Sequence, residues 1–416
     1  MPPLSVMFKT VSSDCNLDCL YCYYRQSLEG ERVRRRMDIR LLDGFLPQYM
    51  EYVADSHQVN LSWQGGEPTL AGLDFFRQTV ELEAKYARPP TVINNAIQTN
   101  AVLVDDEWAE FFAAYRFLVG VSLDGPEEIH DAVRKDRGGN GSFRRVIAGI
   151  EALRKRKVDL NILCVVGPHN VRKARELMAF FRREGLTYLQ FIPAMGFQST
   201  EPDKPPAYLI SPEAYAEFLV SLFNEWYREG IPTVSVRIFD NFLQSAVGSP
   251  NNLCVYSEKC DSGVIIEYNG DVFPCDFYIH PEWRLGNISI DSFKGIVEST
   301  SRQSFVRRKI SLPSLCLTCE WRNLCKGECP RNWPPVPGGY GTSYFCQSYR
   351  TLFEHAGDRI GTLAARIAGY RNYLAWQHTH PGARLPRNGG CPCGSGRKFK
   401  NCCGAPELAA SYLFRQ

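Results

Sequence analysis

Short apolar runs alternate with helix-like stretches from residue 4 to about residue 195. The apolar runs predict six strands, at residues 4–11, 59–63, 91–97, 117–123, 160–166 and 188–192. Between them, apolar residues spaced three and four apart predict helices, most clearly from Phe143 to Leu153 and again at residues 171–183. Six β-α repeats predict a parallel sheet with helices outside it, either an open doubly wound sheet or an incomplete barrel.

The pattern changes in the second half of the chain. Residues 197–212 are rich in Pro, Ser, Asp and Lys, which is typical of a surface connection, and a helix is predicted at residues 214–229. Asn269-Gly270 stands between two β-rich runs and predicts a hairpin with a two-residue turn. Residues 377–390 have the composition of a linker. The sequence therefore predicts a second domain that starts near Cys254, and a small separate tail.

Length, charge and cysteine content narrow the function classes. The 416 residues leave room for two or three domains, and a net charge of +3 gives no reason to expect nucleic acid or a membrane as partner. No apolar run has the length of a membrane span, and the start lacks the pattern of a secretory signal, so we expect a cytoplasmic protein. Because structural disulfides are rare in that compartment, the 16 cysteines indicate metal ligation.

Cys15, Cys19 and Cys22 follow the first predicted strand with the spacing C-x3-C-x2-C. Thiolates are the natural ligands of iron–sulfur clusters, and three of them would leave one iron of a cubane open to a small molecule. The same spacing would also place the three cysteines on one face of a helix, as a buried stripe. The loop-forming residues Ser12-Ser13-Asp14, directly after the strand, favour the cluster.

Polar residues follow the next three predicted strands. They form the segments Gln64-Gly65-Gly66-Glu67-Pro68, Gln98-Thr99-Asn100 and Ser122-Leu123-Asp124-Gly125. The carboxyl ends of parallel strands meet at one edge of a sheet, where ligands bind. Paired glycines let the backbone approach a ligand closely, and Glu67 offers a carboxylate to an amine. Taken alone, the Gly-Gly-Glu-Pro segment could also be a simple reversal of the chain.

The three cysteines, together with Gly65-Gly66-Glu67-Pro68, resemble the motifs of radical S-adenosylmethionine (radical SAM) enzymes. In that family the cysteines hold a [4Fe–4S] cluster, whose free iron binds S-adenosylmethionine. An electron from the cluster cleaves this cofactor and gives a 5′-deoxyadenosyl radical that abstracts hydrogen. The cofactor carries the radical chemistry, and the protein positions it and excludes water.

Eight further cysteines lie between residues 254 and 346, and their spacing resembles the auxiliary-cluster region called SPASM. The resemblance implies two more [4Fe–4S] clusters, which makes three in all. One would be held by Cys254, Cys260, Cys275 and Cys329, and the other by Cys316, Cys319, Cys325 and Cys346. A zinc ribbon is the alternative, because C-x2-C pairs often bind zinc. A chain that already carries a radical cluster favours iron–sulfur ligation.

Within this family the chain resembles anaerobic sulfatase-maturating enzymes over nearly all of residues 3–350. The matching segments are residues 12–17, 64–72, 117–126, 274–278 and 284–288. The resemblance implies oxidation of a Cys or Ser in a C/S-x-P/A-x-R segment of an unfolded or nascent sulfatase to Cα-formylglycine. It also implies an electron donor such as a flavodoxin or ferredoxin.

The same resemblance assigns roles to individual residues. Cofactor contacts are expected from Tyr21, Gly66, Ser122, Arg134 and Met195, together with Gly65 and Glu67 of the glycine-rich segment. Asp276 matches the proposed general base of the family. Alternatively, its side chain would only hydrogen-bond the backbone in the turn at residues 273–278.

The tail carries a motif of its own. Cys391, Cys393, Cys402 and Cys403 form a C-x-C-x8-C-C pattern that resembles the SEC-C zinc knuckle. Four thiolates on a tight, Gly-rich turn suit tetrahedral Zn2+, and a further iron–sulfur cluster is the rival. The basic residues Arg397, Lys398 and Lys400 suggest docking to a partner or simply a solvated face.

The expected fold is therefore α/β, in four parts. These are an incomplete (β/α)6 TIM-like barrel at residues 1–235, a SPASM domain with a C-terminal helix at 236–376, a linker at 377–390 and the knuckle at 391–416. Two other functions stay open. The same machinery could form a thioether crosslink in a ribosomal peptide, or the chain could be a non-catalytic electron carrier. The Gly65-Gly66-Glu67-Pro68 segment is evidence against a carrier, because a carrier needs no open iron.

Overall fold

The computed structural model describes residues 4–24, 35–195, 207–228, 230–406, 408 and 411–414. The surface connection expected at residues 197–212 falls largely on residues 196–206, which lie outside the described residues. The chain forms two compact units. Unit 1 comprises residues 1–169, 194–209 and 258–311, and unit 2 comprises residues 170–193, 210–257 and 312–416. This division differs from the expected ranges, because residues 258–311 fold with the N-terminal part.

Unit 1 is built on strands in the order β10-β9-β8-β1-β2-β3-β4-β5. Their bounds are β1 Ser5–Lys9, β2 Gln58–Trp63, β3 Val92–Thr99, β4 Leu118–Ser122, β5 Leu160–Val166, β8 Gly263–Glu267, β9 Asp271–Phe273 and β10 Gly286–Asn287. Strands β1 to β5 pair in parallel, which confirms the predicted parallel sheet. Strand β8 adds to the other side of β1, also in parallel, with Ser5 opposite Gly263. This pairing brings the residues after β9 within reach of β1.

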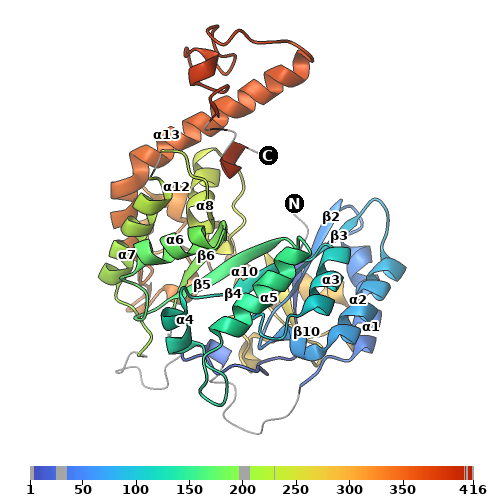
Figure 1. The fold of residues 1–416 in the computed structure, drawn as a ribbon. Helices are drawn as coiled ribbons and strands as arrows, with labels where there is room; N and C mark the ends of the chain where they lie inside the picture. The colour runs from blue at the N-terminus through green and yellow to red at the C-terminus, as the bar shows by residue number, and fades with distance from the viewer. Residues whose placement is uncertain are drawn as a thin grey trace. The chain divides into compact units, whose positions relative to one another are not determined.

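Helices cover these strands, and Figure 1 shows α1, α2, α3 and α5 alongside them. The helices of unit 1 are α1 Ile39–Tyr52, α2 Leu73–Tyr86, α3 Asp106–Ala114, α4 Glu127–Val133, α5 Phe143–Lys155, α9 Phe293–Val297 and α10 Thr300–Arg307. Their starts use polar caps, as where the Asp38 carboxylate accepts a hydrogen bond from the Arg40 N–H. In the core, the Phe8 ring stacks on Trp63 with centroids 4.8 Å apart, and Phe76 of α2 packs against the same indole.

Unit 2 is mainly helical. Its helices are α6 Ala174–Arg183, α7 Pro212–Trp226, α8 Arg237–Ala246, α11 Ser314–Leu317, α12 Arg322–Cys325 and α13 Cys346–Thr379, and its strands include the parallel pair β6 Tyr188–Pro193 and β7 Ser235–Val236. The 34-residue α13 packs against both α7 and α8. Aromatic contacts fill these interfaces, as between Phe242 and Phe353, whose centroids are 4.9 Å apart. Among the described residues, no helix combines the length and the apolar character needed to cross a bilayer.

Several predicted element bounds need correction. The helix predicted at residues 214–229 is α7, and it begins at Pro212 because the Ser211 hydroxyl caps it by accepting from the Ala214 N–H. The hairpin of β8 and β9 forms, but its turn is not of two residues. Ile266 pairs with Val272, and only Gly270 in the turn has a positive φ, +87°, so three residues connect the strands. Helix α13 ends at Thr379, which lies inside the range expected to be a linker.

Candidate active site and metal centres

The loop that carries Cys15, Cys19 and Cys22 follows β1 and contains no α-helix within the described residues 4–24, so the cysteines are not a helical stripe. All three thiols influence one another. Burial, followed by nearby Glu67 and then Cys19 and Cys22, raises the pKa of the Cys15 thiol. Burial and Cys22 also raise the pKa of Cys19 to about 11, although Arg134 opposes the shift. Three crowded thiols that resist ionisation on their own are a donor set that a cationic cluster would stabilise, so they fit a [4Fe–4S] group.

The glycine-rich segment lies directly against this cysteine loop. The Glu67 N–H donates to the Asp14 carbonyl over 2.8 Å. A Cβ atom at Gly66 would lie 2.0 Å from that carbonyl oxygen, and the Gly66 φ is +52°. Only glycine allows this approach. The two segments that the sequence singled out are therefore held together by backbone contact.

Glu67 has a different environment from the one expected. Its side chain is fully buried, and its two oxygens accept hydrogen bonds from the Thr69 N–H and hydroxyl, the Thr99 hydroxyl and the Asn100 N–H, at 2.7–3.0 Å. Burial raises the pKa of Glu67, and these donors oppose the rise. The carboxylate thus joins the ends of β2 and β3. This geometry favours a structural role over the amine contact that the sequence suggested.

A buried ionic cluster centres on Asp124, which follows β4. The Asp124 carboxylate accepts from Arg134 Nε at 2.9 Å and Nη2 at 3.2 Å, and also from the Tyr21 hydroxyl. Burial opposes ionisation, but Arg134 and these hydrogen bonds hold the pKa of Asp124 below its ordinary value. Arg134 Nη1 lies 4.0 Å from the Cys19 sulfur. The structure therefore brings Tyr21 and Arg134 together beside the cysteine loop.

Ser122 and Met195 are two further residues that are expected from the sequence to contact the cofactor. Ser122 lies at the end of β4, and its hydroxyl accepts from Gln98 Nε2 over 3.1 Å. Met195 is half-buried and follows β6 along the chain. Asp124 stood in a segment that the sequence singled out, yet its role as the partner of both Tyr21 and Arg134 was not predicted.

Asp276 lies in a second buried cluster. Lys9 Nζ is 2.7 Å from Asp276 Oδ1, and only 1% of the lysine side chain and 9% of the aspartate side chain are exposed. The Tyr24 hydroxyl donates to Asp276 Oδ2 over 2.9 Å, and the Tyr23 hydroxyl donates to the same oxygen. Burial opposes ionisation, but Lys9 and the two hydroxyls hold the pKa of Asp276 below its ordinary value. The carboxylate is therefore ionised, and its partners here are side chains of β1 and of the cysteine loop.

Sequence reasoning missed the three partners of Asp276. Tyr23 and Tyr24 directly follow Cys22, and Lys9 is the last residue of an otherwise apolar strand. A charged residue that ends a buried strand was the available signal.

One of the two expected auxiliary ligand sets gathers within unit 2. Burial, Cys346 and Cys319 raise the pKa of Cys316 to about 11, and burial, Glu328, Cys346 and Cys316 raise that of Cys325 to about 12. Cys316, Cys325 and Cys346 lie on α11, α12 and α13 respectively. Cys316 is within electrostatic reach of Cys319, Cys325 and Cys346, and four such thiols fit a fully ligated cluster. Of the other set, Cys254 and Cys329 belong to unit 2, and Cys260 and Cys275 belong to unit 1.

The four cysteines of the tail converge. The sulfur atoms of Cys391, Cys393, Cys402 and Cys403 all lie within 4.8 Å of one another. Tetrahedral zinc with Zn–S bonds of about 2.3 Å places its sulfurs about 3.8 Å apart, so this donor set fits the metal after a small contraction. The knuckle packs against Tyr370, Tyr373 and Trp376 of α13. Beyond it, the Ser411 hydroxyl donates to the Pro232 carbonyl over 2.5 Å, and the Tyr412 hydroxyl donates to Asp240.

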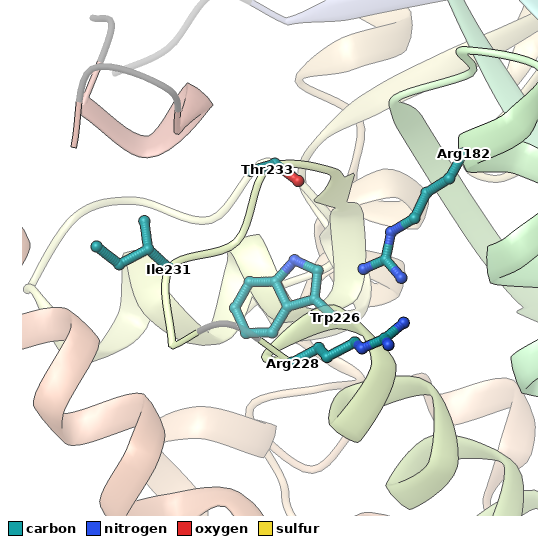
Figure 2. Close-up of a pocket in the computed structure, with 5 residues that line it drawn as sticks. All are labelled: Arg182, Trp226, Arg228, Ile231 and Thr233. Carbon is teal, nitrogen blue, oxygen red and sulfur yellow. The ribbon is translucent and has the colours of Figure 1, made fainter. Parts of the chain in front are cut away.

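A separate cavity of about 200 Å³ lies in unit 2 and is shown in Figure 2. Its lining residues are Arg182, Trp226, Arg228, Ile231 and Thr233. The Trp226 N–H already donates to the Val234 carbonyl, and Arg182 donates to the Glu225 carbonyl. None of the residues predicted for the active site lies in this cavity.

Three family models match the chain. The radical SAM superfamily model matches residues 10–181, an iron–sulfur cluster-binding domain (SPASM) matches residues 254–320, and the SEC-C motif matches residues 387–405.

Individual relatives match over most of the chain. It is 36% identical over 372 residues to a cysteine-type anaerobic sulfatase-maturating enzyme of Clostridium perfringens (strain 13 / Type A). The match covers 88% of this chain and 100% of the relative. It is also 36% identical over 371 residues to a serine-type anaerobic sulfatase-maturating enzyme of Bacteroides thetaiotaomicron, over 85% of this chain and 89% of the relative.

Solved structures agree with these matches. Native anSMEcpe with bound AdoMet and Cp18Cys peptide superimposes with a TM-score of 0.81 at 36% identity, over 88% of this chain and 100% of that one. Streptococcus suis SuiB bound to precursor peptide SuiA gives a TM-score of 0.59 at 15% identity, over 83% of this chain and 76% of that one. The second likeness is one of fold alone.

Proposed function

The chain belongs to the anaerobic sulfatase-maturating enzymes of the radical SAM superfamily, and from this membership we propose that it oxidises a Cys or Ser of a sulfatase to Cα-formylglycine. It is a radical SAM enzyme that uses S-adenosylmethionine and iron–sulfur clusters and acts on a peptide. The target residue stands in a C/S-x-P/A-x-R segment of an unfolded or nascent sulfatase.

The placement of Asp276 carries this proposal. When bound, S-adenosylmethionine and the clusters would supply the radical chemistry: the cofactor-derived radical would take a hydrogen atom from Cβ, and an auxiliary cluster would take one electron from the substrate. The S–H or O–H proton must leave in the same oxidation, and Asp276 accepts it. Oxidation of Ser gives the aldehyde directly, whereas oxidation of Cys gives a thioaldehyde that water hydrolyses with release of sulfide. Its carboxylate is ionised, is buried and is held by Tyr23 and Tyr24, which directly follow the cysteine loop. A base in this position serves the oxidation of either a thiol or a hydroxyl.

The remaining residues hold the cofactors. Cys15, Cys19 and Cys22 hold the cluster that binds S-adenosylmethionine, and the two auxiliary sets named above hold one [4Fe–4S] cluster each. Tyr21, Gly65, Gly66, Ser122, Arg134 and Met195 shape the cofactor site. The Asp124 carboxylate orients both Tyr21 and Arg134, because it accepts hydrogen bonds from each. The tail knuckle binds one Zn2+.

This chemistry also indicates an electron donor and a cellular location for the enzyme. Reduction of the first cluster needs a low-potential donor such as a flavodoxin or ferredoxin. A cytoplasmic location suits both the reduced cysteines and a nascent substrate, and neither nucleic acid nor a membrane takes part.

Anaerobic reconstitution followed by mass analysis of peptides tests the proposal. The enzyme, S-adenosylmethionine and a strong reductant should convert a peptide with Cys or Ser before x-Pro-x-Arg into an aldehyde that a hydrazine traps. The same peptide with Ala at the target position is the control. If cofactor is cleaved while neither peptide reacts, and a Cys-rich peptide instead gains a thioether bond, the enzyme is a peptide crosslinker.

A further inference from the structure

Lys9 is a buried cation at the centre of the Asp276 cluster. It ends β1, and 1% of its side chain is exposed. Its Nζ lies 2.7 Å from Asp276 and 3.9 Å from the centroid of the Tyr24 ring. Removing an ammonium group from water costs free energy, so a buried lysine needs interactions that offset this cost.

A second carboxylate lies within electrostatic reach of the same lysine. Glu267 ends β8, is 7% exposed, and pairs across the sheet with Lys9 itself. Glu267 interacts electrostatically with both Lys9 and Asp276, and its carboxylate accepts hydrogen bonds from Ser12 and from the Tyr268 N–H. Without the lysine, two buried carboxylates would face each other. The ammonium group of Lys9 therefore holds Asp276 close to the cysteine loop in spite of Glu267.

Gly65 leaves the space that the lysine side chain occupies. A Cβ atom at Gly65 would lie 2.5 Å from Lys9 Cε, 3.1 Å from the Ser12 carbonyl oxygen and 3.2 Å from Lys9 Cγ. Its φ of +102° is also unfavourable for a residue with a side chain. The Lys9 side chain therefore accounts for the absence of a side chain at Gly65. The Asp14 carbonyl accounts for the absence of one at Gly66.

We propose that Lys9 is a positioning residue for Asp276, and that Gly65 lacks a side chain so that Lys9 can reach Asp276. The proposal rests on the assignment of Asp276 as the base. Lys9 fixes the direction of the carboxylate by its 2.7 Å contact with Oδ1, while Oδ2 receives both tyrosine hydroxyls, of which that of Tyr24 also lies 3.2 Å from Oδ1. Lys9 itself takes no proton from the substrate.

The test compares Lys9→Met and Gly65→Ala with the wild type. Methionine keeps the length and apolar stem of the side chain and removes the charge. In Lys9→Met, formylglycine formed per 5′-deoxyadenosine should fall about tenfold or more, because misplacing a catalytic group has effects of this order. Iron content and the KM for the peptide should be unchanged. Gly65→Ala should lower the same ratio, because the added methyl displaces Lys9, and it should also slow cofactor cleavage, because Gly65 helps to shape the cofactor site.

Lys85→Met is the matched control. Lys85 also forms an ion pair with an aspartate, Asp43, at 2.9 Å, but it is 56% exposed and lies on α2. This variant should keep the wild-type ratio. A wild-type ratio in Lys9→Met would overturn the proposal. A wild-type ratio in Gly65→Ala would overturn the explanation of that glycine.

A double-mutant cycle measured by thermal unfolding gives a readout that does not depend on the reaction. Lys9→Met should lower the midpoint of unfolding, because it leaves Asp276 buried beside Glu267 without a cation. Adding Asp276→Asn should restore part of the loss. Strict additivity of the two substitutions would contradict the pairing. If the wild type forms no formylglycine, the proposed function fails, and this cycle still decides whether Lys9 acts on Asp276.

Discussion

Replacing Asp276 by Asn removes the proposed base and keeps the shape of its side chain. The Asn oxygen can still face Lys9 Nζ, 2.7 Å away, and the tyrosine hydroxyls can rotate to accept from the amide. General-base catalysis typically contributes about 100-fold to 10,000-fold to a rate, and we expect a loss of formylglycine formation in that range. Cofactor cleavage should continue, because the Arg134–Asp124 ion pair beside Cys19 does not involve Asp276.

The assay measures 5′-deoxyadenosine and formylglycine in the same anaerobic reaction, with iron content as the check on folding. Asp271→Asn is the matched control. Asp271 lies on β9, a few residues before Asp276, and pairs with Arg284, but its side chain is 22% exposed and it also accepts a hydrogen bond from Asn287 of β10. The control should keep product formation. Near-wild-type product from Asp276→Asn would refute the reasoning and direct the search to other carboxylates.

Three further predictions concern the metal centres and the core. Replacing Cys15, Cys19 and Cys22 together by Ala should remove about one cubane of iron, leave the auxiliary clusters and abolish cofactor cleavage, as iron analysis and 5′-deoxyadenosine assays would show; cleavage in this variant would contradict the assignment. A chain that ends at Gly382 should lose one zinc by metal analysis and keep its iron and its activity on short peptides; loss of all activity would place the knuckle in the active site. Burial raises the pKa of Glu83 to about 7 against 4.5 when exposed, although Asn95 opposes the shift, so stability present below pH 4.5 is lost as the pH rises to about 7. A rise of the pKa from 4.5 to about 7 corresponds to about 3 kcal/mol, and Glu83→Gln should flatten the dependence of the unfolding midpoint on pH; an unchanged profile would exclude Glu83 as its cause.

The local parts of the site could be predicted from the sequence. Cys15, Cys19 and Cys22 lie within one loop, and the four knuckle cysteines lie within one short turn, so their spacing alone indicates shared ligation. The parallel order of β1 to β5 follows from the alternation of strands and helices, because each strand is joined to the next by a helix.

The long-range parts could not be predicted. Asp276 meets Lys9 because β8 pairs with β1, and no periodicity in the sequence encodes a pairing between residues as distant as Ser5 and Gly263. The hydrogen-bond partners of Glu67 could not be predicted for a related reason. Its four donors come from Thr69, Thr99 and Asn100, and two of these residues lie on another strand end. From the sequence alone, a carboxylate beside two glycines suggests a ligand contact. Only the fold shows that the end of the neighbouring strand supplies hydrogen-bond donors to it.

Transfer of deuterium from the substrate to the cofactor tests the central claim most directly. A sulfatase peptide whose target Cys or Ser carries deuterium at Cβ is incubated anaerobically with the reconstituted enzyme, S-adenosylmethionine and a reductant. We predict that the 5′-deoxyadenosine gains one deuterium while the peptide becomes an aldehyde. Unlabelled 5′-deoxyadenosine, with the deuterium kept in the peptide, would contradict hydrogen abstraction from the target residue.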